Sequence, residues 1–135
     1  MTGLLDTNVA LYLLGGRLAA PLPEGEYGVS VVTEMEMLAW PSLTPEEEAR
    51  VRAFLGTVEL CELTAPIRAR AVRLRREQGL KLPDAIVCAT ALEHAVDLWT
   101  NDARLTGIAV SSAGRWLSLL SPCPSTPPSP PRIRT

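Results

Sequence analysis

The chain has 135 residues, of which 47% are hydrophobic, and this composition suits one globular domain with its own core. Its formal net charge of −2 excludes a protein that binds nucleic acid through an overall basic surface, so any such contact must be local. Three cysteines without metal-ligand spacing, no signal peptide and no membrane-spanning run predict a cytoplasmic protein with free thiols and no membrane contact.

The first half of the chain predicts two strand–helix units and a third helix. In order, these are a strand at 3–5, a turn at 6–8, a helix over 9–14, a strand at 28–32, a helix over 33–40 and a helix from 45 to 55. Pro41 ends the second helix. Thr44 is the predicted N-cap of the third helix, and Glu47 completes a capping box.

The second half continues the alternation of strands and helices. The predicted elements are a strand within 58–63, an arginine-rich helix from Ala65 to Gly79, a helix from Leu82, a strand at 97–100 and a strand at 108–110. Strands that alternate with helices need crossover connections, so we expect an α/β fold with a mostly parallel sheet and helices on both faces.

The last fifteen residues differ in composition from the rest. Residues 121–135 contain six prolines and cannot bury enough apolar surface to offset the ordering of their backbone. We therefore predict a domain over residues 1–120 and a mobile tail over 121–135. The tail is either a dispensable extension or a proline-rich segment that a partner recognises.

The helix from Leu82 carries one carboxylate at the start of an otherwise apolar segment. Pro83 suits a first helical turn, and the residues after Asp84 include no charge as far as Leu92. On its own, Asp84 is explained as a helix-start residue that interacts favourably with the helix dipole. A functional role requires other acids near it.

Other acids follow the predicted strands. Asp6 follows the first strand, Asp102 follows the strand at 97–100, and either Glu34 or Glu36 lies in the helix after the second strand. Ligand sites in parallel α/β sheets lie outside the carboxyl ends of the strands, so these acids and Asp84 are expected to share one cleft. Neighbouring carboxylates repel one another unless they take up protons or bind a hard cation, which favours Mg²⁺ or Mn²⁺.

Four short motifs together resemble the PIN domain, and most closely the VapC type of toxin ribonuclease. The motifs are Leu4-Leu5-Asp6-Thr7-Asn8, the run from Ser30 to Glu36, the run from Leu82 to Ala91, and Thr100-Asn101-Asp102. They occur in the family's order and spacing, and the resemblance spans roughly residues 3–112. It implies a three-layer α/β/α sandwich and a metal-dependent endoribonuclease.

The resemblance also implies functional residues and partners. By motif position, Asp6, Glu36, Asp84 and Asp102 form the catalytic and metal-binding set, with Mg²⁺ or Mn²⁺ as cofactor. The implied partners are an RNA substrate and a cognate antitoxin that blocks the site. The family pattern also implies a homodimer, for which Met35 and Met37 are candidate contact residues unless both belong to the core.

Several assignments stay open at this point. Glu34 and Glu36 are about 200° apart on a helix, so only one of them reaches the cleft, and the family pattern favours Glu36. Thr7, Asn8 and Thr100 border the acids and are candidates for binding substrate phosphate or metal-bound water, although Thr7 and Asn8 also suit a turn.

The nearest cations to the acids are Arg104 and Lys81, and they are candidates for holding the RNA backbone. The arginines of the helix over 65–79 spread around it, so they fit a solvated face better than an RNA track.

Two other functions are compatible with an acidic pocket. One is a PIN fold that has become a catalytically silent binding module. The other is a receiver-type signalling domain, but that would require a phosphorylated Asp after the central strand and a Lys after a late strand, and neither is evident.

Overall fold

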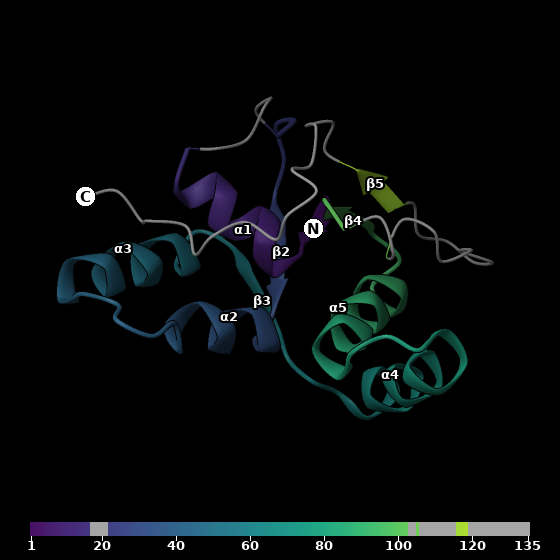
Figure 1. Ribbon diagram of the computed structural model, residues 1–135. Helices are drawn as coiled ribbons and strands as arrows, with labels where there is room; N and C mark the ends of the chain where they lie inside the picture. Colours follow the sequence, from purple (N-terminus) through teal and green to yellow (C-terminus); the bar gives the residue numbers. More distant parts are fainter. Residues whose placement is uncertain (17–21, 103–104, 106–115, 119–135) are drawn as a thin grey trace.

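Five parallel strands form a central sheet in the computed structural model, which describes residues 1–16, 22–102, 105 and 116–118. In chain order they are β1 (Gly3–Leu5), β2 (Tyr27–Ser30), β3 (Glu59–Cys61), β4 (Asp97–Thr100) and β5 (Trp116–Ser118). Their order in the sheet is β3-β2-β1-β4-β5, and every neighbouring pair is parallel. β1 is therefore central, with β2 on one side and β4 on the other (Figure 1).

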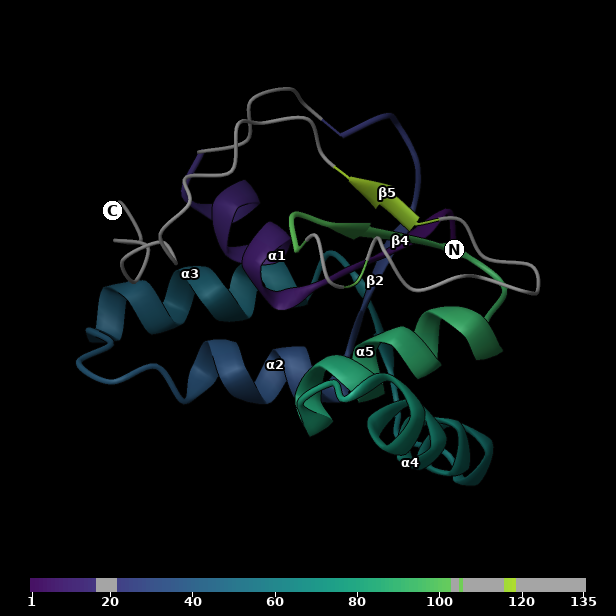
Figure 2. The same cartoon turned by 45° about the vertical axis from the view of Figure 1, so that its right-hand side comes forward.

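Helices cover both faces of this sheet. Within the described ranges they are α1 (Thr7–Leu14), α2 (Val31–Leu38), α3 (Pro45–Leu55), α4 (Ala65–Gln78) and α5 (Leu82–Glu93). The buried apolar residues divide them into α1, α2 and α3 on one face and α4 and α5 on the other. Figures 1 and 2 show the two groups on opposite sides of the sheet. The predicted three-layer α/β/α sandwich with a parallel sheet is confirmed.

The alternation of side chains along the strands produces two separate cores. Leu4 of β1 lies opposite Leu98 of β4, and both are buried against α4 and α5. The next residue along, Leu5, lies opposite Val29 of β2, and both are buried against α1, α2 and α3. Because successive strand residues point to opposite faces, both faces of β1 are apolar and β1 is buried at the centre.

Two predicted boundaries were wrong by two residues. The strand expected at 28–32 ends at Ser30, whose hydroxyl accepts a hydrogen bond from the Val32 amide at 3.1 Å and caps α2. The helix therefore includes Val31 and Val32, which the β-branched pattern had assigned to the strand. In the same way α1 begins at Thr7, not at residue 9, because Asp6 caps it.

Most other elements agree with the sequence. The Thr44–Glu47 capping box of α3 is formed, and α4 ends at Gly79 in the left-handed conformation (φ 68°) that glycine adopts readily. Cys61 and Cys88 are free thiols, as predicted. β5 was not predicted, and the strand expected at 108–110, the tail at 121–135 and Cys123 lie outside the described residues. None of the described helices has the length and apolar character needed to cross a membrane.

The arginines of α4 hold neighbouring backbone and side chains. Arg70 forms an ion pair of 2.7 Å with Glu93 of α5, and Arg75 donates to the Leu80 carbonyl at 2.9 Å. Arg68 donates to the Leu63 carbonyl at 3.2 Å. These contacts hold α4 against its surroundings.

Candidate active site

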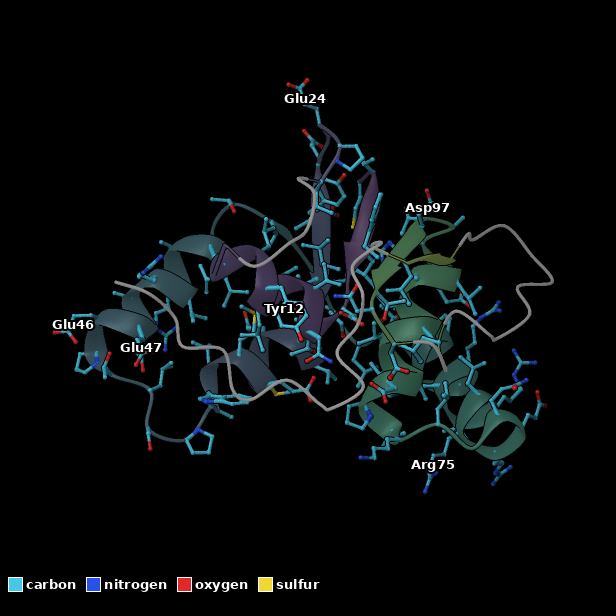
Figure 3. All side chains as sticks on the ribbon, turned by 45° about the horizontal axis from the view of Figure 1, so that its top comes forward. Tyr12, Glu24, Glu46, Glu47, Arg75 and Asp97 are labelled. Atoms are coloured by element: carbon cyan, nitrogen blue, oxygen red, sulfur yellow. The ribbon has the colours of Figure 1, made fainter. Side chains whose placement is uncertain are left out.

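The topology brings the carboxyl ends of β1 and β4 together. After β1 the chain builds outward through β2 and β3, and then returns to the opposite side of β1 with β4. The crevice between β1 and β4 is therefore the switch point at which parallel α/β sheets bind ligands. Asp6 and Asp102 follow these two strands. Glu24 and Asp97 lie at the opposite edge, where β2 and β4 begin (Figure 3).

Asp6 is the most buried acid of this crevice, with 6% of its surface exposed. One carboxylate oxygen accepts the Val9 amide at 2.8 Å as the cap of α1, and the other accepts the Thr100 hydroxyl. Burial raises the pKa of Asp6 to about 6, the two hydrogen bonds partly oppose the shift, and the charges of Asp84 and Asp102 add to it. When no cation is present, Asp6 therefore keeps its proton up to about pH 6, well above the usual range of an aspartate.

Thr100 links the ends of β1 and β4. Its hydroxyl donates to Asp6 and accepts the Asp102 amide at 3.0 Å, and its side chain is completely buried. The Asp6 amide donates to the Trp99 carbonyl at 3.1 Å, which extends the pairing of the two strands by one residue. Thr100 lies behind Asp6 and is absent from the described lining of the cavity, although sequence reasoning had expected it to bind substrate.

α2 positions the glutamate of the site. Glu36 accepts a hydrogen bond of 2.7 Å from the Thr7 hydroxyl, and the Thr33 hydroxyl lies 3.0 Å from the Thr7 oxygen. Because Thr7 has one hydrogen and donates it to Glu36, Thr33 is the donor of the second bond. Glu36 lines the same cavity as Asp6, whereas Glu34 does not, as the family pattern favoured.

Asp84 comes from the opposite layer. It lies in the first turn of α5, whose N-cap residue Lys81 makes no side-chain capping bond. Half of the residues of this helix are buried, including Cys88 one turn after Asp84. Burial raises the pKa of the Cys88 thiol, and the charges of Asp84, Asp6 and Asp102 raise it further. The negative field of the acids thus extends into the core beneath them.

All four predicted acids line one cavity of about 360 Å³. Its complete described lining is Asp6, Thr7, Asn8, Leu11, Glu36, Ala39, Trp40, Pro41, Asp84, Val87 and Asp102. Thr7 and Asn8 are therefore at the cavity, and Arg104 lies outside the described residues. Within the described ranges no three acidic, histidine or cysteine side chains are close enough to form a ready-made metal cluster.

The donor chemistry of the cavity fits a hard divalent cation. The ionisable side chains of its described lining are all carboxylates, and both oxygens of Asp6 keep lone pairs beyond the hydrogen bonds that they accept. Mg²⁺ binds through a few carboxylates and retains several waters, which suits acids that line a cavity without touching one another. The absence of histidine and cysteine from this lining disfavours zinc.

Sequence reasoning did not assign Thr33 or Trp40 to the site. Thr33 was read only as a helix start, yet it is completely buried and bonded to Thr7. Trp40 was read only as the end of a helix, yet it lines the cavity. The spacing of three residues between Thr33 and Glu36 places both on one side of α2, but Trp40 follows the end of that helix, so helical spacing does not predict its position.

Of the two methionines predicted as candidate dimer contacts, one is exposed and the other is buried. Met35 has 54% of its surface exposed, but Met37 is completely buried in the core between α1, α2 and α3. Two positions apart on a helix, the side chains point to different sides, and only one of them faces solvent.

The fold and the candidate site together define a class of α/β/α proteins with a cavity lined by four carboxylates at the switch point of a parallel sheet. A family model described as "PIN domain" matches residues 3–110. The chain belongs to the PIN domain family, which confirms the predicted resemblance. Family membership also removes the receiver-domain alternative.

Solved structures with the same fold include toxin–antitoxin complexes. A chain of a toxin–antitoxin complex from Klebsiella pneumoniae is 36% identical to this protein, with a TM-score of 0.67. The match covers 79% of this chain and 92% of that chain. DNA-bound VapBC from Salmonella typhimurium is 20% identical, with coverages of 89% and 99% and a TM-score of 0.71. VapBC-5 from Mycobacterium tuberculosis is 20% identical, with coverages of 87% and 98% and a TM-score of 0.67. The comparison with curated proteins found no match.

Proposed function

We propose that the protein is a metal-dependent endoribonuclease and the toxin of a toxin–antitoxin pair. The observation that carries this proposal is the convergence of Asp6, Glu36, Asp84 and Asp102 on one cavity at the β1–β4 switch point. Membership of the PIN domain family supports the nuclease activity, and the solved toxin–antitoxin complex at 36% identity supports the role as a toxin.

The four acids are held at the cavity by different parts of the fold. Asp6 is held by Thr100 and the Val9 amide with lone pairs directed to the cavity, and Glu36 is held by Thr7. Asp84 and Asp102 approach from α5 and from the end of β4. When bound, Mg²⁺ or Mn²⁺ would lower the pKa of a coordinated water and neutralise charge on the scissile phosphodiester. No side-chain nucleophile is required.

The remaining residues and partners complete the proposal. Thr7, Asn8 and Arg104 contact the RNA backbone, and Thr100 acts through Asp6. The partner is an antitoxin that covers the cavity, the protein is a homodimer, and it acts in the cytoplasm. The nuclease domain spans 1–120, and residues 121–135 form an extension. The family match ends at residue 110, which is consistent with an extension that the activity does not need.

The test is incubation of the purified protein with labelled RNAs in Mg²⁺, in Mn²⁺ and in EDTA. We expect cleavage only with metal, and no cleavage by Asp6→Asn, Asp84→Asn or Asp102→Asn. Glu24→Gln is the matched control, because Glu24 is exposed and lies at the opposite edge of the sheet (Figure 3). Cleavage that persists in excess EDTA contradicts the proposal. Metal binding without cleavage of any RNA would instead favour the silent binding module.

A further inference from the structure

Trp40 lines the acidic cavity, and it is not part of either apolar core of the described residues. It follows the end of α2, four residues after Glu36, and Pro41 beside it also lines the cavity. Trp40 is partly exposed and belongs to neither apolar core. Among the described residues the only paired aromatic rings are those of Tyr27 and Trp99, so no ring covers Trp40.

The charge of the cavity makes this aromatic wall important for binding. The described lining includes four carboxylates and no lysine or arginine, so it repels the phosphates of an RNA strand. A cation at the acids relieves the repulsion at one phosphate only. Uncharged contacts add affinity that this repulsion does not oppose, and Trp40 is the only aromatic residue of the described lining.

We infer that Trp40 is the platform on which a nucleobase of the bound RNA stacks beside the acids. This inference rests on the proposed function. In a duplex both faces of each base are covered by its neighbours, so only a base in a single strand or loop can stack on a protein ring. Because every base has an aromatic face, Trp40 supplies affinity and selects unpaired RNA without selecting one base.

Binding measured without cleavage tests this inference. The protein carries Asp84→Asn to prevent cutting, and fluorescence anisotropy follows its binding to a labelled single-stranded oligonucleotide and to the matched duplex in Mg²⁺. Trp40→Ala should weaken single-strand binding by roughly 5- to 150-fold, the range expected for loss of one stacked base, and should change duplex binding little. Trp40→Phe keeps a ring and should restore most of the affinity.

Two controls separate stacking from a general loss of structure. Met35→Ala removes an exposed apolar side chain of α2 outside the described cavity lining, and its RNA affinity should be unchanged. Single-stranded RNA should quench tryptophan fluorescence in Trp99→Phe but much less in Trp40→Ala. In the cleavage-competent chain, Trp40→Ala should raise KM and leave kcat nearly unchanged.

The outcomes also separate this inference from the proposed function. Cleavage of RNA by the parent together with unchanged single-strand affinity in Trp40→Ala overturns the stacking role alone. Unchanged RNA affinity with lost binding of a cognate antitoxin would assign Trp40 to the protein interface and overturn it as well. Failure of the parent to bind or cut any RNA overturns the proposed function and the inference that rests on it.

Discussion

At the scale of single residues, the direction of each hydrogen bond fixes where the acids of the cavity point. Thr100 donates its hydrogen to Asp6 and accepts the Asp102 amide, so one hydroxyl aligns acids from two strands. Thr7 donates to Glu36 and accepts from Thr33. The carboxylates are thus oriented by hydroxyl groups that themselves have no freedom to turn, which is how an active site is held in place before its ligand arrives.

Thr33 is expected to be a positioning residue that acts on Glu36 through Thr7. Thr33→Val keeps the shape of the buried side chain and removes one hydrogen bond, whose net value of 0.5–1.5 kcal/mol corresponds to a loss of roughly 2- to 12-fold in kcat. Thr33→Ser keeps the hydroxyl and should restore kcat, and Thr7→Val should cost more because it removes the direct bond to Glu36. Steady-state kinetics measure this series. Equal kcat in Thr33→Val and Thr33→Ser would show a purely structural role.

The raised pKa of Asp6 predicts how the stability of the EDTA-treated protein depends on pH. The folded protein holds the Asp6 proton up to about pH 6, whereas the unfolded chain loses it near 3.8. The contribution of Asp6 to stability is therefore fully present below pH 3.8 and is lost as the pH rises through 6, by about 3 kcal/mol at most. Urea unfolding of the parent and of Asp6→Asn across this range gives the difference between them.

The Asp6→Asn variant isolates this effect, because Asn is an equally good N-cap and does not titrate. The parent should lose stability relative to Asp6→Asn between pH 4 and 7, and in EDTA at pH 7 the variant should be the more stable protein. A difference between the two proteins that is independent of pH would contradict the assignment of the raised pKa to Asp6.

At the scale of elements, local signals in the sequence predict where helices begin and end, but they do not predict how the helices contact one another. The capping box at Thr44 and the glycine at 79 mark the helix ends because the chemistry of a cap is contained in a few neighbouring residues. Val31 and Val32 misled the prediction, because their β-branched character favours a strand until the Ser30 cap is known. Propensity is a weak signal that tertiary structure overrides.

The acids of the candidate site could be predicted from the sequence, but the threonine hydroxyls that hydrogen-bond to them could not. Asp6 and Asp102 could be placed together because parallel strands end at a common edge, whereas Asp84 opens a helix that follows another helix and was placed with them by the family motif. The Thr100–Asp6 bond joins residues 94 positions apart, and the Thr7–Thr33 bond joins residues 26 apart. No pattern within one element reports such pairs, and the cavity position of Trp40 likewise depends on how α1 and α2 pack.

The cap of α3 gives a prediction in which stability and activity separate. Thr44→Ala removes the bond from the Glu47 amide and should lower the free energy of unfolding by about 1 kcal/mol. None of the residues of α3 lines the described cavity, so the rate of RNA cleavage should stay at the parent value. Urea unfolding and a cleavage assay on the same preparation measure both quantities. A large loss of activity would mean that α3 supports the site through α2.

At the scale of the whole molecule, the four acids come from all three layers of the fold. Asp84 belongs to α5 on one face, Glu36 to α2, which packs on the other, and Asp6 and Asp102 to the sheet between them. Their mutual repulsion is a cost of folding that the unfolded chain does not feel. A cation bound by residues of all three layers would therefore stabilise the assembled fold and not one element of it.

This coupling predicts the response of thermal stability to Mg²⁺ without any knowledge of the RNA. A ligand that binds only the folded state stabilises it by RT ln(1 + [L]/Kd), about 2.7 kcal/mol at a hundredfold excess over Kd. In EDTA, Asp84→Asn should melt higher than the parent because one repelling charge is gone. In Mg²⁺ the parent should gain far more than Asp84→Asn, which has lost a ligand.

Two glutamate variants on α2 sharpen this comparison, because Glu36 lines the described cavity and Glu34 does not. Glu36→Gln should respond to Mg²⁺ as weakly as Asp84→Asn does, since Glu36 lines the cavity, whereas Glu34→Gln, on the same helix but outside the lining, should respond like the parent. A thermal-shift series of the four proteins with and without Mg²⁺ measures the effect. If Asp84 were only a helix-start residue, Mg²⁺ would raise the melting temperature of all four proteins equally, and the shared metal site would be refuted.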